Sequence, residues 1–268
     1  MKFSYSSARL RSLLDRLAVA VLLLITWQWV SSSYGEYWVS APLTTMVQLH
    51  RDIMDGSLVI HGGYTIQESL IGFLIGGLPA VIIPFLLRRH PFINAVIDPF
   101  MIAGYGVPKI ALAPIFIIWF GIGIESKIAV VAIATFFIVF FTTQAGVRSL
   151  NGGLVHMAQV AGASEWAIMR SVVLPSALPH IFSGIKIAAP YAVGAAVITE
   201  MISSNRGLGY MLAAAANNFH SAGFFSMLIA VTALVLILNG VIAVLERHCF
   251  RWRTTLDNNG MYSAGSNG

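Results

Sequence analysis

The chain has 268 residues, of which 57% are hydrophobic and 10% are charged, and its mean hydropathy is +0.79. A soluble domain carries about 25% charged residues, so this composition excludes a water-soluble fold and indicates a membrane protein. The formal net charge of +5 comes from short basic clusters between apolar runs, which favours membrane topology over nucleic-acid binding. The single cysteine, Cys249, excludes an internal disulfide framework and a cysteine-rich metal site.

The N-terminal part of the chain combines a basic segment, residues 1–16, with a following apolar run. A secretory signal has the same order of charged and apolar regions, but no small-residue cleavage site follows and the apolar run continues to Tyr34. We therefore predict an uncleaved first transmembrane helix over 17–33. The external connection after it, 35–67, contains an amphipathic stretch over 43–58 that we expect on the membrane surface.

Hydropathy and the positions of the charges predict an all-α membrane protein with six transmembrane helices. A helix needs about 20 mainly apolar residues to cross the hydrocarbon core. The windows that satisfy this condition are residues 17–33, 69–87, 99–120, 128–147, 183–202 and 224–245. The third window contains Lys109 beside Pro108 and before Pro114, so we expect that helix to be kinked or to start late.

Lysine and arginine residues gather on one side of this topology. On the side of the N-terminus lie the basic residues of segment 1–16 and then Arg88, Arg89, Arg148, Arg170, Arg247, Arg251 and Arg253. The opposite side receives only Arg51, Lys127 and Arg206. Because positively charged loops stay in the cytoplasm, both termini are predicted to be cytoplasmic.

Two ionisable residues in the fifth span, Lys186 and Glu200, are candidates for an ion relay, since charges inside membranes are commonly functional. They lie 14 positions apart, which separates their backbones by about 21 Å along a helix. A direct pair is therefore excluded. We expect each side chain to reach its own membrane interface instead, which weakens the case for an ion-coupled carrier.

The connection between the fourth and fifth spans predicts two short helices that are broken at Gly162. Ser164 is placed to cap the second helix, Glu165 suits its positive N-terminal end, and Leu174-Pro175 is expected to end it. Small residues at the bend would let another surface approach the backbone closely. This shape suits docking into a partner's groove, although a plain connecting loop with locally satisfied turns is the alternative.

Here the chain resembles the permeases of ABC importers, whose loop signature is Glu-Ala-Ala, three residues, a glycine and, about a dozen residues later, a Leu-Pro pair. The matching positions are His156, Met157, Ala158, Gly162, Leu174, Pro175 and a second pair, Leu178 and Pro179. Further blocks at 108–123, 145–149, 162–166 and 206–210 look like the nitrate, sulfonate and taurine branch. Together the resemblance covers residues 66–252.

The resemblance implies a six-helix type I importer fold in a bacterial inner membrane. The chain is then divided into a cytoplasmic segment (1–16), the first helix with its external connection (17–63), the permease domain (64–252) and a disordered polar tail (253–268). The residues implied to couple to the ATPase are His156, Met157, Ala158, Gly162, Ala163, Ser164, Glu165, Leu174 and Pro175. His156 replaces the usual glutamate. The imidazole either alters the charge and pH dependence of coupling or occupies a tolerant position.

The family resemblance also implies partners: a second copy of the chain, two ATPase subunits and an external solute-binding protein. The chain has no phosphate-binding loop, so ATP and Mg²⁺ would be bound by the ATPase and no cofactor, metal or nucleic acid by this chain. The predicted translocation path lies between the two copies and includes Thr142, Thr143, Gln144 and Thr199. The implied cargo is a small anion such as a sulfonate, taurine or nitrate.

Two other classes of protein, a secondary carrier and an intramembrane hydrolase, receive less support from the sequence. A secondary carrier needs ion-coupling residues at the bilayer midplane, and six spans without a clear inverted repeat give it little support. An intramembrane hydrolase needs a nucleophile and a base in contact, but Ser164 falls in the predicted cytoplasmic loop without a convincingly placed histidine.

Overall fold

The computed structural model describes residues 3–150 and 152–250. Over these residues the regular structure is helical, without strands. The elements are α1 (Phe3–Tyr34), α2 (Pro42–Met54), α3 (Ser57–Leu87), α4 (Pro91–Gly106), the 3-10 helix η1 (Lys109–Leu112), α5 (Ala113–Phe120), α6 (Ile124–Arg148), α7 (Gly152–Val160), α8 (Glu165–Ile168), the π-helix η2 (Met169–Val173), α9 (Leu174–Ile202), α10 (Leu208–Asn217) and α11 (Ser221–Cys249).

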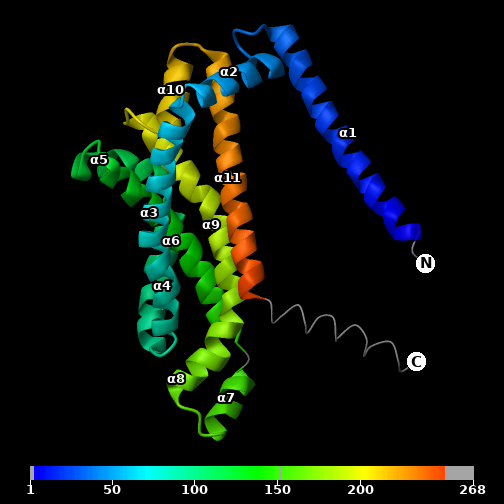
Figure 1. Ribbon diagram of the computed structural model, residues 1–268. Helices are drawn as coiled ribbons and strands as arrows, with labels where there is room; N and C mark the ends of the chain where they lie inside the picture. The colour runs from blue at the N-terminus through cyan, green and yellow to red at the C-terminus, as the bar shows by residue number, and fades with distance from the viewer. Residues whose placement is uncertain (1–2, 151, 251–268) are drawn as a thin grey trace.

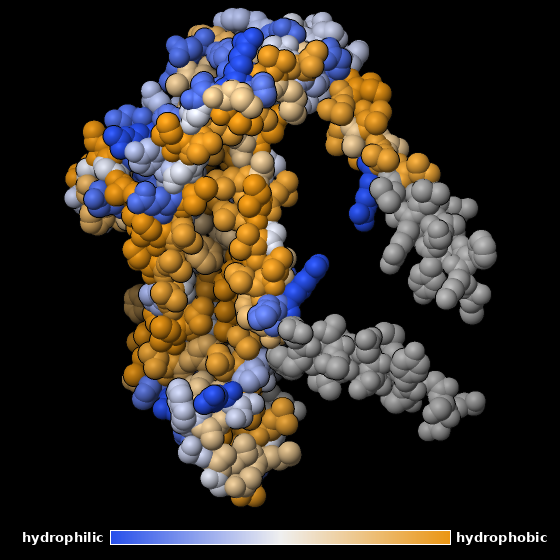
Figure 2. All heavy atoms as spheres, in the orientation of Figure 1, coloured by the Kyte–Doolittle hydropathy of each residue, from blue (hydrophilic) through white to orange (hydrophobic). Residues whose placement is uncertain are grey.

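The long helices α3, α6, α9 and α11 form the body of the molecule (Figure 1). Helices α2 and α10 lie at one end of this bundle, α7 and α8 project from the opposite end, and α1 leans away from it. Apolar side chains cover the middle of the bundle and polar ones gather towards its ends (Figure 2). This distribution is the one expected of a helical bundle whose middle faces lipid.

Five described helical segments are long and apolar enough to cross a membrane, and a sixth span results if α4 and the η1–α5 segment count as one. That pair bends by 84°, which confirms the kink predicted near Lys109. The helix does not begin at residue 99, however. It begins at Pro91, because proline suits the first position of a helix, and Pro99 lies inside it, where the ring removes one internal hydrogen bond.

Small residues in α3 permit the closest helix pairing of the core. Gly72 and Gly76 face α6 with the four-residue spacing that brings transmembrane helices together. A Cβ atom on Gly76 would collide with the backbone carbonyl of Ala132, and one on Gly72 would collide with the Val131 side chain. Val131 is fully buried in the resulting core between α3, α6 and α9.

The amphipathic stretch predicted over 43–58 is shorter in the structure, because α2 ends at Met54 and α3 begins at Ser57. Gly56 separates them with a left-handed φ of 78°, which glycine adopts without steric cost. The Asp55 carboxylate accepts a hydrogen bond from the Ser57 amide at 2.8 Å, and its bonds to Ser57 lower the Asp55 pKa. The boundary is therefore set by local turn chemistry.

One side of α2 attaches it to the bundle. The Asp52 carboxylate is buried and accepts a hydrogen bond from the Ser226 hydroxyl of α11 at 2.9 Å. Helix α10, which the sequence patterns did not predict, packs beside α11, with Leu208 and Leu212 buried against Met227. These contacts hold α2 and α10 together as a cap over one end of α3, α9 and α11.

Candidate functional site

The segment that projects beyond the bundle consists of α7, the bend at Gly162 and α8, and is called the elbow here (Figure 1). The predicted pair of short helices with a break at Gly162 is present. None of the α7 residues is buried, and Met157 and Val160 are 66% and 76% exposed. The elbow thus presents large apolar side chains that the described chain does not cover.

The bend follows from a specific helix ending at Gly162. Its backbone has a left-handed φ of 78°. The Gly162 amide donates to the Gln159 carbonyl at 2.9 Å, and the Ala163 amide donates to the Ala158 carbonyl at 3.0 Å. These two bonds form a Schellman motif, which closes a helix through a residue that is usually glycine. A Cβ atom on Gly162 would meet no other atom of the chain within 4 Å, so glycine is required by the backbone and leaves the outer surface of the bend open.

The start of α8 forms as the sequence predicts. The Ser164 hydroxyl accepts a hydrogen bond from the Ala167 amide at 3.3 Å and caps the helix. The Glu165 carboxylate also lies 3.8 Å from the Arg88 guanidinium and 3.7 Å from that of Arg89. Both arginines belong to the turn between α3 and α4, so these ion pairs connect the elbow to the ends of two further helices.

The prediction that Leu174-Pro175 ends the second helix is wrong. A π-helical turn, Met169–Val173, leads directly from α8 into α9. A proline lacks the amide hydrogen that an α-helix needs at its interior positions, and a wider turn before it lets the helix continue past the missing donor. As a result α8, η2 and α9 form one continuous helical segment over Glu165–Ile202, which joins the elbow mechanically to a membrane helix.

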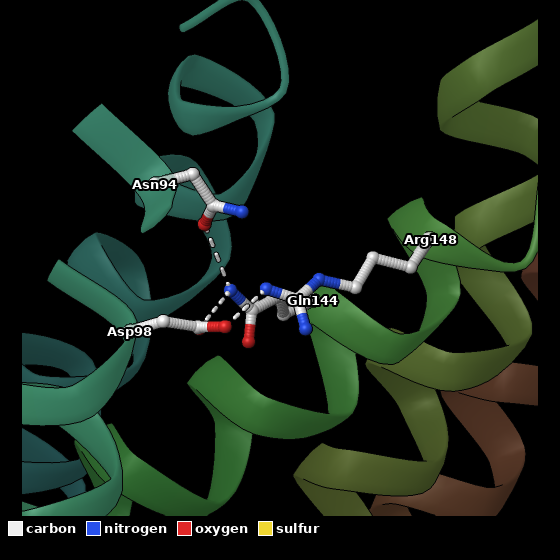
Figure 3. Close-up of polar contacts among 4 residues, drawn as sticks. All are labelled: Asn94, Asp98, Gln144 and Arg148. Carbon is white, nitrogen blue, oxygen red and sulfur yellow. Dashed lines mark hydrogen bonds and ion pairs between the residues drawn. The ribbon is translucent and has the colours of Figure 1, made fainter. Parts of the chain in front are cut away.

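A polar network connects the end of α6, which precedes the elbow, to α4 (Figure 3). The Arg148 guanidinium, at the end of α6, lies 2.8 Å from the Asp98 carboxylate. The buried Gln144 amide donates to Asn94 at 3.1 Å and to Asp98 at 3.2 Å. Gln144 was predicted to line the path, but the structure places its side chain within this helix-to-helix network.

The other predicted path residues are not brought together at one surface. Thr143 and Thr199 are fully buried, and the Thr199 hydroxyl donates to the Ala195 carbonyl of its own helix at 2.7 Å. Thr142 lines a cavity that lies between α4, η1, α6 and α9 and has a volume of about 520 Å³. The same cavity contains Lys109, which sequence reasoning treated only as a sign of a kink.

Glu200 lies near the end of α9, but the prediction that its side chain reaches the membrane surface is wrong. Its side chain is 1% exposed and its carboxyl accepts hydrogen bonds from the Thr65 hydroxyl at 2.8 Å and the Gly209 amide at 2.7 Å. Lys127 and Glu68, both buried, interact electrostatically with it. Burial is possible because α3 and α10 supply hydrogen-bond donors and α6 supplies the countercharge of Lys127, whereas a lone side chain would have to reach water.

Lys186 instead pairs with Glu246 of α11, and both side chains remain partly exposed. Lys186 and Glu200 thus have separate partners, as expected of two residues too far apart on one helix to form a direct pair. The partner of Lys186 lies 60 positions further along the chain, so helix periodicity within the fifth span could not reveal it.

A comparison of the sequence with protein families identifies the family to which this bundle and elbow belong. The family model described as the inner membrane component of binding-protein-dependent transport systems matches residues 68–251. The chain belongs to this family. It is thus a permease of the ABC importer class and a multi-pass membrane protein, which confirms the resemblance noted in its sequence.

Relatives with different named cargoes are similar to the permease over most of its length. It is 30% identical to the riboflavin transport system permease protein RibX of Chloroflexus aurantiacus over 237 residues, 88% of each chain. It is 34% identical to the putative aliphatic sulfonates transport permease protein SsuC of Escherichia coli over 198 residues, 74% of this chain and 75% of the relative. It is 28% identical to the taurine transport system permease protein TauC of Escherichia coli over 199 residues, 74% and 72% of the two chains.

Solved structures confirm the fold. An inward-facing structure of the MetNI methionine ABC transporter matches with a TM-score of 0.63 at 18% identity, covering 74% of the permease and 98% of that chain. An amino acid ABC transporter matches with a TM-score of 0.59 at 16% identity, covering 76% and 97%. The predicted type I importer architecture is therefore present.

Proposed function

We propose that the permease works as a homodimer with two ATPase subunits and an external binding protein, and that the elbow transmits the closure of the ATPases to the membrane helices. The exposed apolar tip of the elbow carries this proposal, because large uncovered apolar side chains beside a rigid bend suit insertion into a partner's groove. In this arrangement the elbow and both termini lie in the cytoplasm.

The contacts of α8 and of the α6 end that precedes the elbow support a mechanical role. At one end η2 makes the elbow continuous with α9, and Glu165 pairs with the arginines of the α3–α4 turn. Before the elbow, Arg148 at the end of α6 pairs with Asp98 of α4. A displacement of the elbow would therefore be applied to several membrane helices together, as switching between inward-open and outward-open states requires.

The proposed cargo is a small anion delivered by the external binding protein. The names of the sulfonate and taurine relatives support this class, although the riboflavin relative has a different cargo. Because the relatives share the permease fold while their cargoes differ, we infer that much of the selectivity comes from the external binding protein. ATP and Mg²⁺ bind to the ATPase, and the permease itself is non-catalytic.

The elbow can be tested by replacing Gly162 with leucine in the complex assembled with its ATPase and binding protein. A left-handed backbone costs a non-glycine residue about 1–2 kcal/mol, so we expect binding-protein-stimulated ATP hydrolysis to fall by roughly 5- to 30-fold while the protein still inserts and folds. Gly152→Leu is the matched control, because Gly152 also has open space around it but no left-handed φ. Normal stimulation by Gly162→Leu would refute the docking role.

An ion-coupled secondary carrier is the second candidate, and the buried Glu68 and Glu200 carboxyls are the observation that favours it. Both hydrogen-bonded oxygens of Glu200 already have donors from the chain, which points to a structural role. Uptake into vesicles that contain the permease but no ATPase distinguishes the two. Accumulation driven by a proton or sodium gradient would establish the carrier and exclude the ATP-driven permease.

A further inference from the structure

The cavity of about 520 Å³ between α4, η1, α6 and α9 has the properties of a ligand site. Its volume falls in the range of about 300–1,000 Å³ that is usual for small-molecule sites. The walls are mostly aliphatic and aromatic, with Tyr105 from α4, Thr142 and Phe141 from α6, and Tyr191 from α9. Few polar groups in an apolar lining are what a site needs to orient an amphipathic ligand.

Lys109 is the only lining residue of this cavity with a formal charge. Among the side chains that the structure describes, those of 14–150 and 152–250, the ion pairs found are those of Glu165, Arg148 with Asp98, and Lys186 with Glu246, and none includes Lys109. Its ammonium lies over the rings of Tyr105 at 4.7 Å and Phe137 at 4.8 Å, and it donates to the Tyr105 carbonyl. These contacts hold the cation in place but leave its charge without a counterion.

A cation without a counterion in a mostly apolar cavity favours an anionic ligand, because the ligand supplies the charge that the chain does not. The break between α4 and η1 places this cation at the cavity wall. Thr142 already donates its hydroxyl proton to backbone carbonyls of α6 at 3.0 Å, so Lys109 and the tyrosine hydroxyls are the donors available to an anion.

We propose that this cavity is a subsite of the translocation path for an organic monoanion that carries an apolar or aromatic group. The proposal rests on the proposed permease function and narrows its cargo. A single ammonium matches one anionic group, and the apolar walls stabilise a ligand that buries a hydrocarbon portion against them. A small, strongly hydrated anion such as nitrate gains only the charge interaction and would bind more weakly.

The test measures binding of radiolabelled benzenesulfonate by equilibrium dialysis to the permease–ATPase complex in nanodiscs of zwitterionic lipid, without nucleotide. We expect saturable binding by the wild-type complex. A charged hydrogen bond contributes about 1.5–3 kcal/mol, so Lys109→Met should weaken binding by roughly 10- to 150-fold. Lys109→Arg, which keeps the charge, should bind within about threefold of wild type. Neutral benzenesulfonamide should bind equally weakly to wild type and Lys109→Met.

The matched control is Lys186→Met, which removes another lysine of a membrane helix. The Lys186 side chain is not part of the cavity lining and pairs with Glu246. It should leave benzenesulfonate affinity unchanged. The thermal midpoint of each variant is measured in the same nanodiscs, and it separates loss of the anion site from loss of the α4–η1 bend. If Lys109 were merely structural, Lys109→Met would lower the midpoint and would weaken binding of benzenesulfonate no more than binding of benzenesulfonamide.

Equal benzenesulfonate affinity in wild type and Lys109→Met would overturn the subsite, as would the absence of saturable binding by a wild-type complex. Either result, found in a complex whose ATP hydrolysis is still stimulated by the binding protein, leaves the permease function standing. Loss of stimulation in every preparation would instead count against the proposed function. Nitrate that competes as strongly as benzenesulfonate would overturn the requirement for an apolar group.

Discussion

Glu200 offers a sharp test of how the permease holds its α9–α10 connection. Its buried carboxyl accepts one hydrogen bond from Thr65 of α3 and one from the Gly209 amide of α10. Replacing Glu200 with alanine leaves both donors buried without this acceptor, and each unsatisfied group costs about 1–3 kcal/mol. We therefore expect Glu200→Ala to destabilise the protein by roughly 2–5 kcal/mol, while Glu200→Gln, which keeps one carbonyl oxygen, loses about half as much.

The measurement is reversible unfolding of the purified permease in mixed micelles, followed by circular dichroism and supported by the thermal midpoint. Glu246→Ala is the matched control, because its pair with Lys186 is partly exposed and such pairs contribute about 0–1 kcal/mol. Equal stabilities of Glu200→Ala and Glu246→Ala would refute the reasoning, since it depends on burial deciding the cost of a lost acceptor.

Two further changes test the packing and the network beside the elbow. Gly76→Leu places a side chain where even a Cβ atom would collide with the Ala132 carbonyl, so we expect α3 and α6 to separate and the yield of folded protein in membranes to fall severely. The control is Gly63→Leu, because a Cβ atom on Gly63 would meet no other atom within 4 Å. Equal yields of the two variants would contradict the close packing of α3 and α6. Asp98→Ala removes the Arg148 acceptor and one of the two acceptors of the buried Gln144 amide, so it should cost about 1–3 kcal/mol. Arg148→Ala should cost less than about 1 kcal/mol. The reverse order in thermal unfolding would show that the exposed ion pair outweighs the buried amide contact.

Local signals in the sequence predicted much of the fold. The spans follow from runs of apolar residues, and five of the predicted windows lie within observed helices that are long enough to cross a membrane. The bend at Gly162 and the Ser164 cap follow from residues within a few positions of one another. Motifs of this kind depend on backbone geometry over one or two turns, so a single segment contains the information that they need.

The sequence patterns failed where local rules competed with neighbouring structure. Pro175 is a sound signal for the end of a helix, but the π-helical turn before it allows α8 to continue into α9. Arg88 and Arg89 counted only as charges that orient the protein, although they also bind Glu165 of the elbow. Lys109 was visible as an ionisable residue in an apolar window, a signal that deserved a functional interpretation.

The sequence by itself determined a helical membrane protein with a two-helix elbow between its fourth and fifth spans, because apolar length, charge placement and capping residues act over short stretches. The permease family followed from the resemblance of its loop and flanking blocks to known ABC importer permeases. Only the tertiary structure decided which polar side chains are structural and which face a cavity. Thr65 and Glu200 are 135 positions apart, and Tyr105, Thr142 and Tyr191 reach one cavity from three helices. Whether a buried polar group is satisfied depends on donors supplied by distant segments, and those partners exist only once the helices have packed.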